Sequence, residues 1–414
     1  MNVAGADPAL IALLTPEAVR ERCNELWQLG LRGELEHFAL DVERLDAAGA
    51  CVVQELQRNY AGAPVPGHSR WRHFELGGRD LWRELLHAHD GMDRDALARA
   101  RFDLAIVSVL LDAGAGPDWR YRDAGSGLVL GRSEGLALAS LRLFHAGLFS
   151  AAGARDPLRC DARVLAAMAP VALARALQCG ADNPLAALDG RCELLRRLGE
   201  VALACPGVFS RDGHTRPGHL YDHLRARAVD GALPAREILI ALLTWLGGIW
   251  PAGRQLGTLR AGDVGQHPAL RRADASDTLV PLHKLSQWLA YSLIEPLQEA
   301  GIRVTDADAL TGLAEYRNGG LLIDTGVLRL RDEAQRARAH DPAGTLVVEW
   351  RALTVAALDL VAARVRALSG HDAESLPLAA VLQAGTWSAG RRLAAQLRAG
   401  GEPPLRIASD GTLF

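Results

Sequence analysis

The sequence predicts a mostly α-helical protein, organised as one large all-helical domain. Apolar residues recur at three- and four-residue steps over many long segments, which is the period of an amphipathic helix. In HKLSQWLAYSLIE (283–295), for example, Leu285, Leu289 and Leu293 share one helix face. The composition, 49% hydrophobic and 23% charged over 414 residues, supplies a large buried core. No G-x-G-x-x-G motif follows an apolar run, so a Rossmann nucleotide-binding domain is not indicated.

The predicted helices follow one another along the chain. The segments with helical periodicity are 16–31, 93–112, 134–149, 163–178, 190–204, 235–247, 283–295, 345–368 and 388–399. Gly114 is expected to cap the second of these helices, and Pro296 to end the seventh. No change of composition marks a linker, so we predict a single α-helical domain over 16–414, preceded by a short segment, 1–15.

Charge and cysteine content exclude several classes of protein. Lys and Arg together number 46 against 49 Asp and Glu, a formal charge of −3, which offers no attraction to nucleic acid. The six scattered cysteines show no C-x-x-C spacing, so neither a disulfide framework nor structural zinc is expected. The first residues do not read as a signal peptide, and the longest apolar run, 238–250, is shorter than the ~20 residues of a membrane helix. We expect a cytoplasmic protein with no membrane partner.

Two cations stand at a helix start, which is the unfavourable end for positive charge. Pro281 suits a first helical turn and places His283 and Lys284 at the N-terminus of the helix. The free N–H groups and the positive dipole end favour an anion there, so added cations suit a bound phosphate or carboxylate. A solvated lysine paired with a nearby acid explains the position equally well, because the dipole contact costs only ~0.3–1 kcal/mol.

A second group of charges lies in an apolar helix. TLVVEWRALTVAALDLVAARV (345–365) is hydrophobic on nearly every side, which predicts a buried helix. Glu349 and Arg351 are two residues apart and cannot face each other, so each needs its own partner. For Glu349 we expect an internal network. Arg351 either reaches a substrate pocket or pairs with an acid such as Glu315 or Asp324, because an unpaired buried guanidinium is costly.

The segment TGLAEYRNGG (311–320) places Glu315, Tyr316 and Arg317 before a pair of glycines. Glycines permit close approach and unusual backbone angles, so these three polar side chains are well placed to line a cleft. A salt-bridged turn between two helices is an equally good interpretation of the same residues.

Two further segments concentrate polar side chains. GHSRWRHFELGG (67–78) contains Arg70 and Trp71, which suit the holding of an oxyanion and stacking on a flat group. In RSEGLALASL (132–141), Ser133 is expected to cap a helix with Glu134 in its first turn, and capping alone explains both residues. No motif supports a serine nucleophile, and the histidines of the first segment lack an acidic partner at metal-ligand spacing.

Several of these segments together carry a family resemblance. They are RWRHFELGG, DLAIVSVLLDAGAG, RSEGLALASL, HKLSQWLAYSLIEPL, LTGLAEYRNGGLLIDTGVL, VEWRALTVAALD, GTWSAGR and SDGTLF. From about residue 20 to the end, the chain resembles the uracil catabolism protein four family, formerly a family with an uncharacterised domain. The resemblance implies a place in a pathway that converts uracil to its nucleotide, opens the ring, and gives ribosylurea species and eventually urea.

Three segments also resemble motif blocks of the queuosine nucleotide N-glycosidase family. HKLSQWL, LTGLAEYRNGG and VEWRALTVAALD match those blocks in order and spacing. This second resemblance implies an all-helical fold distantly similar to helix-hairpin-helix DNA glycosylases. It also implies that Lys284 contacts a 5′-phosphate and that Glu315 serves the ribose and catalysis. The chain departs from that family in having glutamate for aspartate at Glu315, and Asn-Gly-Gly after Arg317 in place of Val-Pro-Gln.

Together the resemblances lead to one hypothesis: hydrolysis of the N-glycosidic bond of a ribosylurea 5′-phosphate to urea and ribose 5-phosphate, with no metal or organic cofactor. Glu315 would stabilise positive charge at the anomeric carbon and orient water. Lys284, helped by His283, would hold the phosphate. The candidate proton donors are Asp112, Glu134 and Asp324. The other residues expected around the substrate are Tyr316, Arg317, Arg351, Arg70 and Trp71.

Three alternatives stay open at this point. A ureidohydrolase would need a metal cluster of His and Asp, which the sequence does not supply. A glycosidase for another nucleoside 5′-monophosphate, including a queuosine-like one, would stack an aromatic base. A non-catalytic protein of the uracil pathway would need neither Glu315 nor Lys284. In each enzymatic case the expected partner is a small nucleotide-like molecule, and the oligomeric state is left open.

Overall fold

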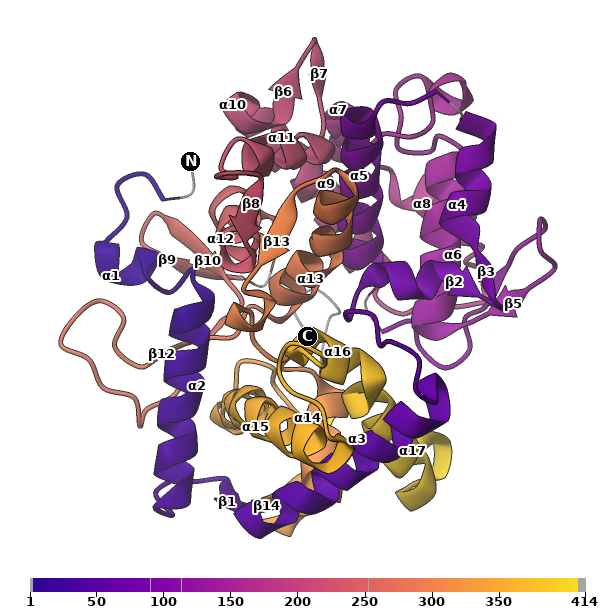
Figure 1. Cartoon of the computed structure of the whole chain (residues 1–414). Helices are drawn as coiled ribbons and strands as arrows, with labels where there is room; N and C mark the ends of the chain where they lie inside the picture. Colours follow the sequence, from indigo (N-terminus) through magenta and orange to yellow (C-terminus); the bar gives the residue numbers. More distant parts are fainter. Residues whose placement is uncertain (1–2, 90, 113, 252, 409–414) are drawn as a thin grey trace.

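The computed structural model describes residues 3–89, 91–112, 114–251 and 253–408, and within these the chain is mostly α-helical, as predicted (Figure 1). The helices are α1 (Pro8–Ile11), α2 (Pro16–Leu31), α3 (Leu45–Tyr60), α4 (Leu81–Leu86), α5 (Arg94–Leu111), α6 (Arg132–His145), α7 (Ala162–Ala166), α8 (Pro170–Ala176), α9 (Leu188–Ala204), α10 (Pro206–Phe209), α11 (Leu220–Arg225), α12 (Ala235–Leu246), α13 (Lys284–Glu299), α14 (Tyr316–Asp324), α15 (Thr345–Ser369), α16 (Leu378–Val381) and α17 (Trp387–Leu397). None of these helices is long and apolar enough to cross a membrane.

The strands are short, and in the described part of the chain they pair only two by two. They are β1 (Phe38–Leu40), β2 (Glu75–Leu76), β3 (Arg79–Asp80), β4 (Tyr121–Arg122), β5 (Val129–Leu130), β6 (Ser210–Arg211), β7 (His214–Thr215), β8 (Ala232–Pro234), β9 (Arg254–Leu256), β10 (Leu259–Gly262), β11 (Val264–Gln266), β12 (Leu279–Pro281), β13 (Arg303–Thr305), β14 (Leu328–Leu330), β15 (Ala339–His340) and β16 (Arg406–Ile407). Most pairs are antiparallel; β8 with β13 and β15 with β16 are parallel. The short strand pairs therefore connect segments between the helices and form no larger sheet among the described residues.

Each predicted helical segment contains a helix, but four predicted boundaries were wrong, one of them in α6, which covers Arg132–His145 rather than 134–149. The segment 163–178 is split into α7 and α8, because Pro170 has no N–H to donate and is found at the first position of a second helix. The helix α13 continues through Pro296 to Glu299. The carbonyl of Ser292, which loses its usual helical donor at Pro296, accepts the indole N–H of Trp71 at 2.8 Å instead. Finally, α5 ends at Leu111 with Asp112 in the C-cap position, so Gly114 does not cap it.

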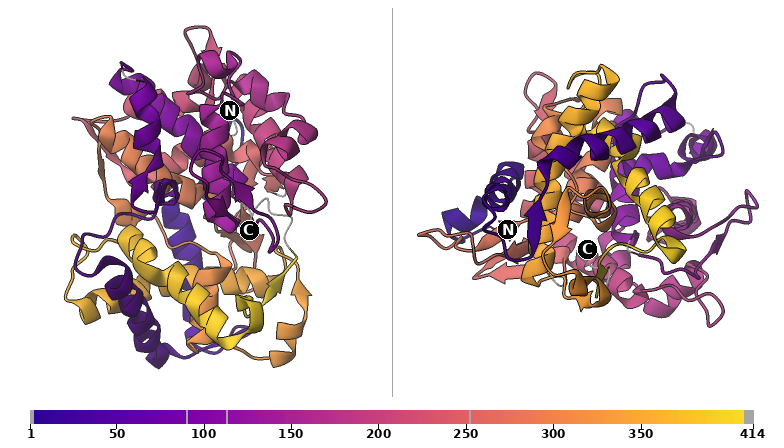
Figure 2. Two further views of the ribbon diagram at one scale, coloured as in Figure 1. Left: turned by 90° about the vertical axis from the view of Figure 1, so that its right-hand side faces the viewer. Right: turned by 90° about the horizontal axis from the view of Figure 1, so that it is seen from below.

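The two ends of the described chain pack together in one part of the molecule. In Figure 1, α2 and α3 lie with α14, α15, α16 and α17 in the lower part, whereas α4 to α12 fill the upper part. Contacts of α15 with both α2 and α3, and of α17 with α3, agree with this arrangement. Figure 2 shows α3 crossing the C-terminal helices when the molecule is seen from below. The buried hydrophobic residues form one connected cluster through both parts.

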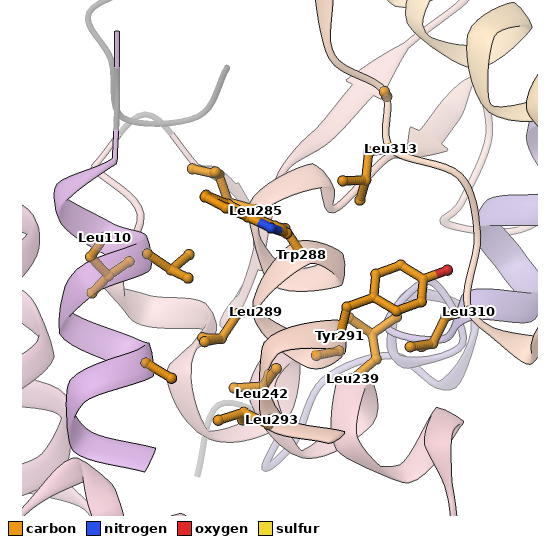
Figure 3. Packing of buried hydrophobic residues seen from close by; sticks show 14 of the residues in the cluster. Leu110, Leu239, Leu242, Leu285, Trp288, Leu289, Tyr291, Leu293, Leu310 and Leu313 are labelled. Carbon is orange, nitrogen blue, oxygen red and sulfur yellow. The ribbon is translucent and has the colours of Figure 1, made fainter. Parts of the chain in front are cut away.

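Helix α13 lies between these two parts and contacts both. Figure 3 shows Leu289 and Leu293 directed toward α5, on the side of Leu110. On another face, the Tyr291 hydroxyl donates to the carbonyl of Thr311 at 3.0 Å, in the segment that leads into α14. Packing of α13 therefore fixes the ends of α5 and α14 relative to its own N-terminus.

The start of α13 is fixed by a short hairpin. Strands β11 and β12 pair antiparallel with Val264 opposite Pro281, so Asp263 lies beside the residues that enter the helix. The Asp263 carbonyl accepts the backbone N–H of Leu282 at 3.0 Å, and its Oδ2 atom accepts the N–H of Lys284 at 3.0 Å. A carboxylate thus caps the helix at its positive end.

Arg351 of α15 completes this junction. Its two Nη atoms donate to Oδ1 and Oδ2 of Asp263 at 2.8 and 2.7 Å, and its Nε donates to the carbonyl of Ala314 at 3.2 Å. Burial alone would raise the pKa of Asp263, but the Arg351 charge and hydrogen bonds outweigh it and lower that pKa. A single guanidinium therefore connects the start of α13 with the residue that precedes Glu315.

We expect Asp263→Asn to reduce the free energy of unfolding by about 3–5 kcal/mol at pH 7, because it leaves the buried Arg351 charge uncompensated. Urea denaturation measures this. The folded pKa of Asp263 is lowered, so ionised Asp263 contributes its full stabilisation of the fold above the usual Asp pKa of 3.8. That stabilisation is lost as the pH falls through the folded pKa, and the difference in unfolding free energy between variant and wild type therefore shrinks in acid. Glu193→Gln, which removes a pair with Arg197 on the surface of α9, is the control and should cost about 0.3–0.5 kcal/mol. Equal effects of both variants would contradict this role of the junction.

Candidate active site

Glu315 lies at the N-cap of α14 and is 7% exposed. Its Oε2 accepts the N–H of Arg317 at 2.9 Å and its Oε1 accepts the N–H of Asn318 at 2.5 Å, which explains why a helix begins here. Each oxygen keeps further acceptor capacity, since an ionised carboxylate has about four lone-pair sites. Burial raises the pKa of Glu315, although the two N–H groups and the Lys284 charge oppose the shift.

Lys284 is the first residue of α13 and its side chain is partly buried. Burial lowers the pKa of its ammonium, while the fields of Glu315, Asp112 and Asp263 act in the opposite direction. No carboxylate of the described residues lies within ion-pair distance of its Nζ atom. The structure thus brings Lys284 into the field of Glu315 and Asp112 and leaves its ammonium available to an anion.

Lys284 is also the only lysine among the 46 Lys and Arg residues of the chain. A chain that otherwise uses arginine for every cation retains a compact ammonium at this position, where arginine's broad planar fork has a different reach and geometry. The sequence carries this signal, because a count of its lysines finds only Lys284.

His283, predicted as a second phosphate ligand, serves the fold instead. It is fully buried, adopts a left-handed backbone conformation (φ 47°), and its Nε2 donates to the carbonyl of Leu13 at 2.9 Å. That contact attaches the segment before α2 to the start of α13. We therefore leave His283 out of the anion site.

Asp112 and Arg70 form a buried pair at the end of α5. Arg70 is fully buried; its Nη1 donates to Oδ2 of Asp112 at 2.8 Å and its Nε donates to Oγ of Ser108 at 2.7 Å. The same Oδ2 accepts the hydroxyl of Ser133 at 3.1 Å. Ser133 therefore does not cap α6, which begins one residue earlier with Gly131 at its N-cap. Arg70 holds Asp112 rather than acting alone as an oxyanion ligand.

Trp71, expected to stack on a substrate, is a core residue. It is 4% exposed, its indole N–H is used by the Ser292 carbonyl, and the Arg101 guanidinium lies 4.2 Å from its ring centroid. Phe74 and Trp82 pack against its edges. The ring and the indole N–H are engaged within the fold, so the structure assigns Trp71 to the core rather than to substrate stacking.

Tyr316 and Arg317 follow Glu315 at the start of α14. The Arg317 backbone supports the Glu315 carboxylate, while its guanidinium lies 4.9 Å from the Tyr316 ring centroid and donates to the carbonyl of Gly401 at 3.0 Å. Burial raises the pKa of Tyr316. These contacts place Tyr316 beside the site and turn the charged end of Arg317 toward residues after α17.

The other two predicted proton donors, Glu134 and Asp324, lie in different places relative to Glu315. Glu134 lies in the first turn of α6 and its carboxylate is 3.3 Å from Nη1 of Arg391, at the edge of the site. Asp324 is at the other end of α14 from Glu315, about 13 Å along the helix, and forms a two-point pair with Arg398. Asp324 is therefore excluded as a proton donor at Glu315, and it is not the partner of Arg351.

Glu349 forms the internal network expected for it. Its Oε1 accepts the N–H groups of His37 and Phe38 at 3.1 and 2.8 Å, and its Oε2 lies 3.1 Å from Nε2 of His267. Of the two possibilities for Arg351, the structure shows the internal pair, and its partner is Asp263 rather than Glu315 or Asp324. No local signal marks Asp263, because it lies 88 positions earlier, in a long polar connection.

Two surface cavities lie away from these charges. One of about 500 Å³ is lined by residues of α8 and α9, among them Pro170, Cys192 and Arg196. Another of about 510 Å³ adjoins Asp324 and Arg398. Neither cavity is lined by an acid with a shifted pKa beside a cation that lacks an ion-pair partner. Lys284, Glu315 and Asp112 combine these features, so we place the candidate site there. In the described parts of the chain, no three His, Cys, Asp or Glu side chains are arranged to hold a metal ion.

Comparison with known proteins supplies the family. A model described as "Protein of unknown function (DUF1688)" matches residues 12–414. The chain belongs to this family. Among its relatives, protein urg3 of Schizosaccharomyces pombe is 36% identical over 413 residues, covering 97% of this chain and 98% of the relative. Uracil catabolism protein 4 of Lachancea kluyveri is 32% identical over 414 residues, covering 92% and 93%. These relatives confirm the resemblance to the uracil catabolism protein four family.

Close packing of α17 on α14 positions Glu315 in this DUF1688 chain. A Cβ atom added at Gly390 of α17 would lie 2.1 Å from the carbonyl oxygen of Arg317, so the first turn of α14 would have to move. We expect Gly390→Ala to lower the free energy of unfolding by about 1–3 kcal/mol. Gly207→Ala, at a glycine with open space around it, is the control and should change stability little. Urea denaturation compares the two, and an unchanged midpoint for Gly390→Ala would refute the close contact.

Proposed function

We propose that the protein hydrolyses the N-glycosidic bond of a ribosylurea 5′-phosphate, releasing urea and ribose 5-phosphate in uracil catabolism. The observation that carries this proposal is the juxtaposition of one unpaired lysine, Lys284, with two buried carboxylates, Glu315 and Asp112. The name of the Lachancea kluyveri relative supports the pathway. The matching motif blocks support the bond class and a likeness to helix-hairpin-helix glycosylase folds.

Cleavage of this bond develops positive charge at the anomeric carbon. A carboxylate held in a buried position stabilises that charge strongly, because water does not screen it. Glu315 is fixed by two backbone N–H groups and needs no reorganisation to face the sugar. In the overall reaction, the hydroxyl of water joins the anomeric carbon, and the water proton is taken up by the leaving nitrogen of urea.

Lys284 is the proposed phosphate ligand. Its ammonium lies at a helix N-terminus whose first N–H is already capped by Asp263, so the lysine itself supplies the charge for a phosphate. Binding energy at the remote phosphate then positions the sugar against Glu315. Of the three candidate proton donors, Glu134 remains the proposed acid near the leaving group, since Asp324 is too far away and Asp112 is paired with Arg70.

The six cysteines are free in the structure, which supports our proposal that the protein works in a reducing compartment, the cytoplasm. A mononucleotide-sized substrate also agrees with the chain's slightly negative charge, because it needs one anion site rather than a basic groove.

We expect Glu315→Gln to lower the rate of urea release from ribosylurea 5′-phosphate by about 10²–10³-fold. Because the folded pKa of Glu315 is raised, its ionised form costs stability at neutral pH; Gln relieves that cost but keeps one acceptor oxygen for the two capping N–H groups, so the variant should stay folded at pH 7.5, as urea denaturation checks. Wild-type activity should rise with pH through a value above the usual 4.5. Glu333→Gln, in an exposed pair with Arg336, is the control.

The assay quantifies urea and ribose 5-phosphate from chelator-treated protein, with uridine 5′-phosphate and a queuosine-like 5′-nucleotide as competing substrates. No release of urea, or full activity of Glu315→Gln, would reject the proposal. Faster cleavage of a nucleotide with an aromatic base would replace it with a nucleotide glycosidase.

Lys284→Met tests the phosphate role separately. We expect about a 10–150-fold loss of kcat/KM with ribosylurea 5′-phosphate, because a charged hydrogen bond is removed. With unphosphorylated ribosylurea, wild type and variant should be equally slow. Burial lowers the pKa of Lys284, so the variant should be no less stable near neutral pH. Lys284→Arg should fail to restore activity. Equal losses with both substrates would assign Lys284 to the reacting sugar instead.

A further inference from the structure

Three buried side chains near the proposed site carry polar atoms that the fold leaves unused. Nη2 of Arg70, Oδ1 of Asp112 and Nε1 of Trp288 are buried and make no hydrogen bond to the described residues. The side chains are 0%, 4% and 7% exposed. Buried polar groups are almost always hydrogen-bonded, and a neighbourhood with three such atoms in one place is typical of a ligand site.

These atoms belong to one neighbourhood. Nη1 of Arg70 binds Oδ2 of Asp112 at 2.8 Å, and the Arg70 guanidinium lies 5.6 Å from the Trp288 ring centroid. Trp288 is one helical turn after Lys284 on α13, so both side chains lie on the same helix face. The field of Asp112 acts on Lys284 and on Tyr316. The cluster therefore adjoins the proposed sugar and phosphate positions.

The unused atoms differ in hydrogen-bonding character. Asp112 is paired with Arg70, so its Oδ1 is an acceptor only. The Arg70 Nη2 and Trp288 Nε1 groups are donors only. A complementary ligand needs N–H groups on one side and an oxygen on the other. A carboxylate would meet Asp112 with like charge, and a guanidinium would meet Arg70 with like charge.

We propose that Arg70, Asp112 and Trp288 form a recognition site for a planar, uncharged ureido group, with Asp112 accepting its N–H and the two donors binding its carbonyl oxygen. This inference rests on the proposed function and adds the residues that select the leaving group. Hydrogen bonds to the carbonyl oxygen strengthen as the bond to the sugar breaks, because negative charge then grows on the urea.

Three probes of similar shape test the inference in saturation-transfer NMR, each with ribose 5-phosphate present. N-ethylurea carries donors and an acceptor, ethylguanidinium carries donors only, and propionate carries acceptors only. We expect the wild-type protein to bind N-ethylurea at least tenfold more tightly than either charged probe. Comparable binding of all three, or no binding of N-ethylurea, would overturn the inference.

Two variants locate the contacts. Trp288→Phe keeps the ring and removes one N–H, so N-ethylurea should bind about threefold to tenfold more weakly. Trp82→Phe is the matched control, since its indole nitrogen is also buried without a partner but belongs to the neighbouring aromatic cluster. Asp112→Asn should weaken N-ethylurea about tenfold to hundredfold and admit propionate. If Trp288→Phe matches Trp82→Phe, the inference fails whether or not Asp112→Asn folds.

The same preparations are assayed for urea release from ribosylurea 5′-phosphate. Selective N-ethylurea binding without hydrolysis would keep the recognition site and reject the proposed function. Hydrolysis without selectivity among the probes would keep the function and reject the site.

Discussion

The candidate active site depends on one buried ion pair. Asp263 caps the first N–H of α13, where Lys284 begins, and Arg351 binds both oxygens of that carboxylate and the carbonyl of Ala314. Glu315 follows directly. The cation and the carboxylate of the proposed site thus have fixed positions relative to each other, although no direct bond joins them. Such a pair adds little net stability over a hydrophobic equivalent, but it specifies one geometry.

Some charged side chains around the site form ion pairs that stabilise the fold, whereas others remain available to bind a ligand. Arginines form the contacts with Asp263, Asp112 and Asp324, where a planar fork matches a carboxylate. The only lysine stands apart from them. Glu315 combines the two tasks, because the hydrogen bonds that start α14 also hold its carboxylate in a buried position against its desolvation cost. Glu315 therefore both caps α14 and supplies the carboxylate of the proposed reaction.

Local pattern predicted much of this structure and failed where partners are distant. Helical periodicity located the long helices, placed Lys284 at a helix start, and indicated an internal network for Glu349. It could not show that Trp71 would satisfy the carbonyl left free by Pro296, which let α13 continue. Residue type made Trp71 and His283 look like ligands, but tertiary contacts engage the indole N–H of Trp71 and Nε2 of His283. The choice of Asp263 for Arg351 is likewise made only by the folded chain.

Because the chain is synthesised from its N-terminus, the ion pair between Asp263 and Arg351 can form only late in translation. Translation produces Asp263 and Lys284 well before Arg351, which is 88 positions later than Asp263. Until α15 has left the ribosome, the first turn of α13 lacks its guanidinium clamp and the Ala314 carbonyl lacks a donor. A nascent or prematurely terminated chain can form the helices of the upper part without aligning Lys284 and Glu315. The contacts that fix Lys284 relative to Glu315 are therefore complete only after α15 has been synthesised.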